Sequence, residues 1–183
     1  MSEEIKIFRR ATLASIITST YPMIVVGYYF GVTPWNMNRL SIDESDLSFA
    51  ILLFGIFFII SNQIAGRILV PKYGTKLIMS LAFPLVTFPT LLSIVSPSYF
   101  YFLLTSIPAG IGWGASGPIG GIHTQLIEQH FKKIITPYYA MGFNLGILIG
   151  GGLAGIIMLS LIHISEPTRQ AEIAYAVVCL KKK

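Results

Sequence analysis

The chain has 183 residues, of which 54% are hydrophobic and only 11% are charged; its mean hydropathy is +0.71 and its formal net charge is +5. A soluble domain usually carries about 25% charged residues, so this composition excludes an ordinary water-soluble protein and predicts an all-α integral membrane protein, a polytopic helix bundle in contact with the lipid bilayer. The basic residues flank apolar segments or lie near the C-terminus, so the charge does not indicate nucleic-acid binding.

Five apolar stretches are long enough to cross a bilayer as helices, which takes about 20 residues each. A charge at the bilayer centre costs at least about 2.5 kcal/mol, and none of these stretches contains Asp, Glu, Lys or Arg. Residues 1–158 are therefore predicted to form one N-terminal transmembrane bundle. Its five helices are expected at about residues 11–30, 47–66, 77–95, 99–122 and 138–158.

The loops between these stretches predict the orientation of the bundle. If the five helices cross the membrane in alternating directions, all the basic residues outside the C-terminal tail except Arg39 lie on the same side. By the positive-inside rule this basic side is cytoplasmic. The N-terminus is therefore predicted to be cytoplasmic. The basic side is expected to carry Lys6, Arg9, Arg10, Arg67, Lys72, Lys76, Lys132 and Lys133.

Two short connections carry local signals. Ser41 and Glu44 fit a capping box at the start of the second helix, where Asp43 and Asp46 complement the helix dipole. The third and fourth stretches are joined only by residues 96–98, so they are predicted to pack as an antiparallel hairpin.

Glycines recur every four residues in the fourth and fifth stretches. In lipid, small residues at this spacing let two helix backbones approach closely. We therefore expect glycine faces at helix contacts, and smooth faces of this kind would also let helices slide or rock. The expected faces are Gly110 with Gly114, Gly117 with Gly121, Gly142 with Gly146 and Gly150, and Gly151 with Gly155.

The segment "GRILVPKYGTK", residues 66–76, connects the second and third stretches. It resembles the loop of the major facilitator superfamily, whose pattern is Gly-x-x-x-Asp-Arg-x-Gly-Arg-Arg/Lys. The spacing between the glycines is one residue longer here, and Val70 and Pro71 replace the aspartate. The resemblance implies a cytoplasmic gating loop, with topogenic positive charge as the alternative interpretation. The loop would comprise Gly66, Arg67, Lys72, Gly74 and Lys76.

The order of segments over about residues 7–158 is similar to the first part of such a transporter, which has two six-helix halves. The resemblance implies secondary active or facilitative transport of a small-molecule substrate by alternating access, in a bacterial inner (plasma) membrane. The chain as written would be a fragment without transport activity, whose partner is the missing C-terminal half of the same polypeptide. The alternative is a small five-span accessory or assembly membrane protein without transport activity.

The stretch "LSLIHISEPTR", residues 159–169, resembles the translation of a short-read sequencing adapter, and residues 170–183 resemble the continuation of that adapter. Residues 159–183 are therefore expected to be a non-native tail. Pro167 and the charges around it are not expected to continue a membrane span.

The resemblance to major facilitator transporters implies that the first and fourth helices line a central cavity, assisted by the second and fifth. Aromatic, hydroxyl and amide groups there suit solutes of mixed polarity. The alternatives are interfacial aromatics, as for Tyr28, and hydroxyls bonded to their own helix. The substrate-cavity candidates are Thr18, Tyr21, Tyr28, Trp113, Ser116 and Asn144.

Nothing in the sequence assembles a nucleophile, a metal-ligand set or an acid–base pair, so we expect neither an enzyme nor a cofactor or metal site. His123, Glu128 and His130 lie near the end of the fourth stretch, where a solvated cluster is expected. The spans contain no Asp, Glu, Lys or Arg, so the residues leave uniport, symport and antiport open.

Overall fold

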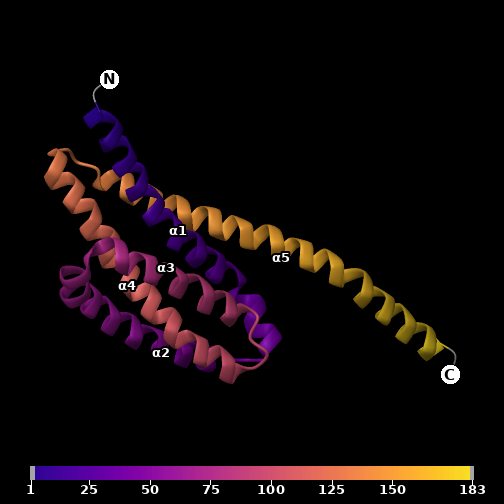
Figure 1. The fold of residues 1–183 in the computed structure, drawn as a ribbon. Coiled ribbons are helices and arrows are strands. Elements are labelled where there is room, and N and C mark those ends of the chain that lie inside the picture. Colours follow the sequence, from indigo (N-terminus) through magenta and orange to yellow (C-terminus); the bar gives the residue numbers. More distant parts are fainter. Residues whose placement is uncertain (1–2, 182–183) are drawn as a thin grey trace.

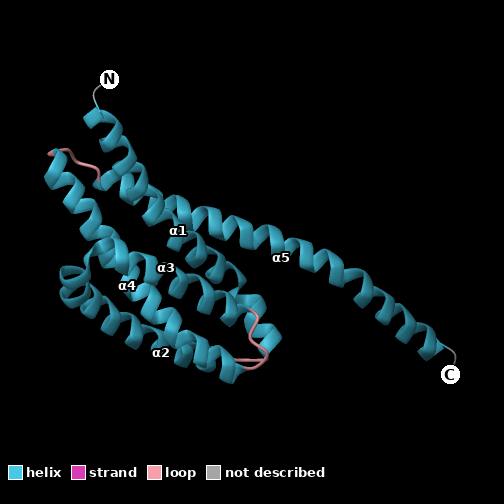
Figure 2. Ribbon diagram, in the orientation of Figure 1, coloured by secondary structure: helices cyan, strands magenta, loops and turns pink. Residues whose placement is uncertain are grey.

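The computed structural model describes the backbone of residues 3–181 and the side chains of residues 3–160. Within that part the chain is a bundle of helices joined by short turns (Figures 1 and 2). The five predicted stretches are helical, which confirms the all-helical fold class. The elements are α1 (Glu3–Leu40), α2 (Glu44–Ile64), the π-helical turn η1 (Ala65–Leu69), α3 (Val70–Ile94), α4 (Tyr99–Phe131) and α5 (Thr136–Lys181).

Three helical stretches of the described part are long and apolar enough to cross a membrane: Glu3–Leu40, Glu44–Ile94 and Thr136–Ser160. The second contains both α2 and α3, between which the chain reverses direction (Figure 1). Helix α4, the fourth predicted span, is not among them. Glycines and the two prolines Pro108 and Pro118 lie among the apolar residues in the middle of this helix.

The reversal between α2 and α3 differs from the loop expected there. Residues 65–69 form the π-helical turn, and Pro71 occupies the first turn of α3, where its missing N–H leaves no bond unmade. Helical geometry is broken only at Gly74, with φ 78° and ψ 161°. This region of backbone space is essentially restricted to glycine, so Gly74 is required by the conformation of the reversal.

Helix α4 lies between α2 and α3 and packs against both. Cβ atoms at Gly110 and Gly114 would collide with the α2 backbone at Phe54 and Phe58. This confirms the first predicted glycine face of α4, and the contact between α3 and α4 agrees with the predicted hairpin. The second face is wrong, because a Cβ atom added at Gly117 or Gly121 would meet no neighbour within 4 Å.

Helix α5 runs along α1 with the predicted glycine face turned toward it. Cβ atoms at Gly142, Gly146 and Gly150 would each lie less than 3.0 Å from α1 atoms, and the α1 residue Gly27 faces α5 in the same way. The predicted pair of Gly151 and Gly155 is wrong as a contact, since Gly155 faces open space. The α5 backbone continues through Pro167, and the side chains of the expected adapter-derived tail from residue 161 onward lie outside the described residues.

Helix α1 extends well beyond the predicted end of its span, and its last turns close the end of α3. The Asn36 side-chain amide is buried and donates to the Ser93 carbonyl at 3.3 Å, while the Arg39 guanidinium donates to the Ile94 carbonyl at 2.8 Å. Arg39 also donates to Asn36 Oδ1 at 2.7 Å. These bonds satisfy carbonyl groups that a helix C-terminus leaves unpaired.

The start of α2 corrects the predicted capping box. Asp43 is the N-cap, and its carboxylate accepts a hydrogen bond from the Asp46 N–H at 2.8 Å. Ser41 instead has a φ of 52° in the preceding turn. Asp43 is the N-cap in place of Ser41 because it directly precedes the first helical residue, Glu44. From that position its short side chain reaches the Asp46 N–H.

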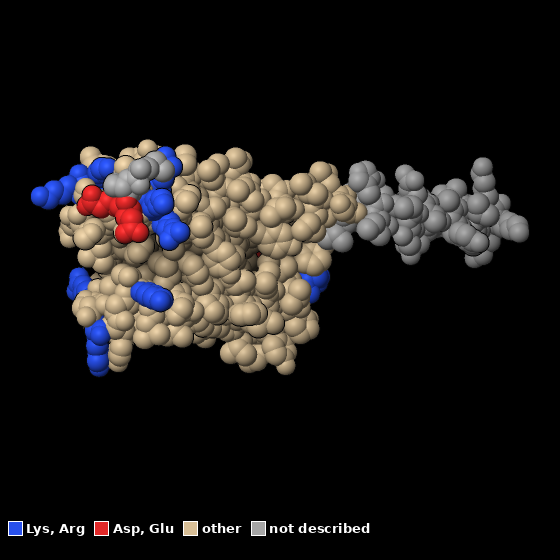
Figure 3. Space-filling model, turned by 45° about the horizontal axis from the view of Figure 1, so that its top comes forward, with Lys and Arg blue, Asp and Glu red and all other residues tan. Residues whose placement is uncertain are grey.

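Lysine and arginine side chains gather at one end of the bundle, with a smaller basic group at the opposite end (Figure 3). The start of α1 and the end of α4 meet at the basic end, where the Phe8 and Phe131 rings lie 5.2 Å apart and Lys133 Nζ is 4.7 Å from the Phe8 ring. Arg39 lies in the last turn of α1, at the other end of that helix.

Candidate functional site

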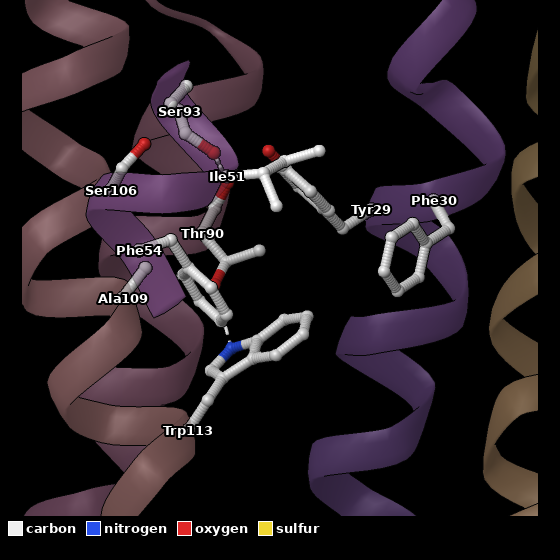
Figure 4. Close-up of a pocket in the computed structure, with 10 residues that line it drawn as sticks. Tyr29, Phe30, Ile51, Phe54, Thr90, Ser93, Ser106, Ala109 and Trp113 are labelled. Atoms are coloured by element: carbon white, nitrogen blue, oxygen red, sulfur yellow. Dashed lines mark hydrogen bonds between the residues drawn. The ribbon is translucent and has the colours of Figure 1, made fainter. Parts of the chain in front are cut away.

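A cavity of about 100 Å³ lies where α1 faces α2, α3 and α4. Figure 4 shows the side chains converging on it from these four helices. The cavity contains no formally charged side chain and combines aromatic, hydroxyl and small residues. Its lining is Tyr29, Phe30, Ala50, Ile51, Phe54, Thr90, Ser93, Ser106, Ala109 and Trp113.

Trp113 is fixed in the wall by a hydrogen bond and two ring contacts. Its indole Nε1 donates to Thr90 Oγ1 at 3.1 Å, and the Thr90 hydroxyl in turn donates to the Val86 carbonyl. The Trp113 ring lies 5.2 Å from the Phe54 ring and 6.2 Å from the Tyr29 ring, both in edge-to-face geometry. Edge-to-face pairs are a favoured aromatic arrangement, so the three rings form a defined wall.

The hydroxyl groups of the lining differ in their availability. Ser93 donates to the Thr90 carbonyl at 2.7 Å, and Ser106 donates to the Phe102 carbonyl at 2.8 Å, so both bond within their own helices. The Tyr29 hydroxyl has no hydrogen-bond partner among the described residues, and it extends from α1 toward the opposite wall (Figure 4). The cavity can therefore hold a compact, mostly apolar group and offer it one hydroxyl.

Of the predicted substrate-cavity residues, Trp113 lies in this lining. Ser116 is buried one turn further along α4, and its hydroxyl donates to the Trp113 carbonyl at 2.9 Å. Tyr28 packs beside Val32, Ile94 and Ala154, on the neighbouring face of α1. The structure thus brings Trp113 and Ser116 close together and places Tyr28 outside the cavity.

The other three predicted residues lie apart from the cavity. Thr18 donates to the Ser15 carbonyl of its own helix at 2.9 Å, and Asn144 is exposed on α5 and donates to the Ala140 carbonyl at 2.9 Å. Tyr21 bonds to the Thr87 hydroxyl on α3, and its ring lies 5.0 Å from that of Phe83. Tyr21 therefore joins α1 to α3.

The sequence reasoning missed most of the lining. Tyr29 carries a usable signal, because it directly precedes Phe30 and follows Tyr28 in an aromatic run. Thr90 and Ser93 share one face of α3, at a spacing of three residues, and mark the polar part of the wall. Their helix was not expected to contribute to a cavity, and only the packing of α3 against α4 brings them there.

The predicted gating loop lies at the basic end of the bundle, away from this cavity. Arg67, Lys72 and Lys76 are exposed, and Lys72 Nζ lies 5.1 Å from the Tyr73 ring centre. A Cβ at Gly66 would sit in ordinary contact with Pro118, 3.5 Å away. The loop cations therefore face away from the packed helices.

A second, more polar hollow of about 200 Å³ lies at the basic end, lined by residues 4, 5, 8 and 130–133. Nearby, Glu128 Oε1 accepts hydrogen bonds from the Ile135 and Thr136 N–H groups, both at 2.7 Å, and from the Thr136 hydroxyl at 2.9 Å. The backbone bonds from Thr136 and Ile135 hold the pKa of Glu128 below its usual value. Within the described part, no group of three or more His, Cys, Asp or Glu is placed to hold a metal ion.

No family model, curated protein or solved structure matches this chain.

Proposed function

We propose that residues 1–158 form the first part of a facilitator-type secondary transporter, embedded in a bacterial inner membrane with a cytoplasmic N-terminus. In this proposal a further helical half of the same polypeptide completes the substrate path. A small solute would cross by alternating access, as the two halves rock about a site between them.

Membrane embedding is supported by the surface of the bundle as well as by its three long apolar stretches. Large apolar side chains are exposed along every helix, including Ile17 at 61%, Ile59 at 62% and Phe88 at 66%. Contiguous apolar surface of this extent is rare on soluble monomers. Lipid chains would cover it without the cost that water imposes.

The observation that carries the transport proposal is the uncharged, aromatic and hydroxyl-lined cavity between α1 and the layer of α2, α3 and α4. Membrane helices that serve only as an anchor need no such cavity, whereas a carrier needs a site that it can close and open. Contact between α1 and α5 through glycines leaves smooth faces along which these helices can shift relative to each other.

The basic end supports the gating part of the proposal. There Gly66, Arg67, Lys72, Gly74 and Lys76 lie on the η1–α3 reversal, with their three cations exposed and free to meet another part of the protein. We assign this segment to a cytoplasmic latch. The substrate path would include the cavity lining together with Thr18, Tyr21, Tyr28, Ser116 and Asn144.

The decisive test is to amplify and sequence the source DNA outward from the codons for residues 150–158. The proposal expects the native frame to continue into a sixth apolar helix, a cytoplasmic linker and six further spans. Native DNA that encodes "LSLIHISEPTR" or stops there would overturn it, and a five-span accessory membrane protein would then be the better description. The recovered full-length protein would next be reconstituted for solute-uptake assays.

A further inference from the structure

We infer that the cavity lined by Tyr29, Phe54 and Trp113 binds an uncharged, ring-sized aromatic group that bears one hydroxyl, as in a phenol. This assignment names the substrate class of the proposed transporter, and in that respect alone it rests on the proposed function. The binding itself follows from the size, the lining and the free hydroxyl of the cavity.

The volume sets the size of the ligand. The cavity measures about 100 Å³, and an engineered apolar cavity of about 150 Å³ in another protein binds benzene. The small side chains of Ala50, Ser106 and Ala109 create this space, because a larger residue at any of these positions would extend into it. A single six-membered ring is therefore the size of group that fits, without a long chain attached.

The lining sets the polarity of the ligand. No charged side chain lines the cavity, and burial of an unpaired ion costs far more than burial of a neutral group. The edge-to-face packing of Phe54 and Tyr29 on Trp113 offers ring edges and faces that favour a further aromatic ring. An uncharged aromatic group is thus preferred over an ion or a sugar.

One polar group remains available to the ligand. Trp113 Nε1 donates to Thr90, and the hydroxyls of Thr90, Ser93 and Ser106 donate to carbonyl groups of their own helices. Tyr29 also lines the cavity, but its hydroxyl forms no hydrogen bond with a described residue. It would exchange a hydrogen bond with the ligand hydroxyl, which gives phenols an advantage over plain benzene rings.

The mouth of the cavity lies between α1 and α2. Phe30, on α1, and Ile51, on α2, line it while remaining 61% and 53% exposed. A ligand can therefore enter past these two side chains without displacing the Trp113–Thr90 bond.

The chain contains two tryptophans, which permits a direct binding test on the purified full chain in detergent micelles. The Trp35→Phe variant leaves Trp113 as the reporter in the cavity, and Trp113→Phe leaves Trp35 at the end of α1 as the matched control. The probe is 4-bromophenol, whose bromine quenches indole fluorescence on contact. We expect saturable quenching of Trp113 and only linear, collisional quenching of Trp35.

Substitutions then assign the binding to the cavity. In the Trp35→Phe background, Tyr29→Phe should weaken 4-bromophenol binding about tenfold, the effect of one lost hydrogen bond, while leaving bromobenzene binding within about twofold. Tyr138→Phe, exposed on α5 and outside the lining, should change neither. Ala109→Val should weaken both probes by reducing the volume, which gives a second test should Tyr29→Phe fold poorly.

Linear quenching of Trp113, or equal affinity for both probes in the protein with Tyr29 intact, would overturn the inference. So would efficient quenching of Trp113 by a bromine-labelled phospholipid that 4-bromophenol fails to displace, because the cavity would then be a fissure for lipid chains. Saturable phenol binding by a protein whose DNA excludes a transporter would retain the site and reject only the proposed function.

Discussion

Helix α1 packs differently against α5 on one side and against α2, α3 and α4 on the other. Toward α5, glycines at positions 142, 146 and 150 let the two helices approach so closely that an added Cβ would collide with α1 atoms. Toward α2, α3 and α4, the rings of Tyr29, Phe54 and Trp113 keep the backbones apart and enclose a cavity. In a bundle of uniformly apolar helices, residue size at the contact decides between a closed seam and an open site.

This difference in packing predicts where the bundle tolerates amino-acid substitutions. At the closed contact between α1 and α5, a side chain added at Gly142, Gly146 or Gly150 would collide with α1 atoms, and at Gly150 these atoms belong to the backbone. The open side already contains free volume and is held by a few specific contacts, of which the Trp113–Thr90 hydrogen bond is one. Substitutions should therefore have their largest effects at the seam and smaller effects around the cavity.

The largest loss of stability is expected for Gly150→Leu, which tests the close contact between α1 and α5. A Cβ there would collide with the α1 backbone, where the Tyr28 nitrogen would be only 2.7 Å away, so we expect a loss of about 3 kcal/mol in the free energy of unfolding. Gly155→Leu is the matched control, because its Cβ would meet nothing within 4 Å. Unfolding in mixed micelles measures both. Equal losses would show that α1 and α5 do not pack through this face.

The next largest effect is expected at the reversal that brings α3 back along α4. Gly74→Ala places a Cβ on a residue with φ 78° and ψ 161°, which should cost about 2 kcal/mol. Gly55→Ala, at a helical position with open space around it, should be neutral or slightly stabilising. The same micelle unfolding experiment compares them, and an unaffected Gly74→Ala variant would contradict the strained reversal.

On the open side, Trp113→Phe removes the indole donor while keeping an aromatic ring in the wall. Loss of the bond to Thr90 should lower the free energy of unfolding by about 1 kcal/mol. Trp35→Phe, at the exposed end of α1, should cost less, although its ring lies 5.2 Å from the Arg39 guanidinium. A smaller loss for Trp113→Phe than for Trp35→Phe would mean that the cavity wall is not held by this bond.

The smallest effect is expected at the turn between α4 and α5, outside both contacts of α1. The pKa of Glu128 is lowered by hydrogen bonds from the Thr136 and Ile135 N–H groups. Its stabilisation is therefore fully present above the ordinary glutamate pKa of about 4.3 and is lost as the pH falls through the lowered value.

Melting temperatures between pH 7 and pH 3 should consequently decline more steeply for the natural chain than for Glu128→Gln. Glu4→Gln is the matched control, because it also removes an acid at the basic end but leaves the hydrogen bonds of Glu128 in place. Parallel pH profiles for the natural chain and Glu128→Gln would contradict the role assigned to this carboxylate.

The helices could be predicted because uncharged apolar stretches of this length have few other stable forms in lipid. Their ends could not. Helix α1 continues to Leu40 because Asn36 and Arg39 find partners at the end of α3, and such a tertiary contact leaves no mark on hydropathy. The reversal at residues 66–76 remains helical except at Gly74, since glycine alone could accommodate the break.

The cavity was far less predictable than the fold. Trp113 could be identified as a large aromatic residue deep in an apolar helix, but its neighbours depend on which faces of α3 and α2 meet α4. Thr90 and Ser93 bond to their own helix as serine and threonine do throughout membrane helices. The local sequence therefore does not distinguish the serine and threonine residues that line the cavity from those elsewhere in the helices.

The seam between α1 and α5 has a consequence for the forces that hold the pair together. The Thr20 and Ile24 carbonyl oxygens of α1 lie beside Gly146 and Gly150, and the Ile147 carbonyl oxygen of α5 lies beside Gly27. Each oxygen thus faces a glycine Cα–H, a weak donor worth about 0.5–1 kcal/mol at helix contacts. Cohesion of this kind needs no expulsion of water, so it operates fully among lipid chains, where the hydrophobic effect gives adjacent helices no reason to associate.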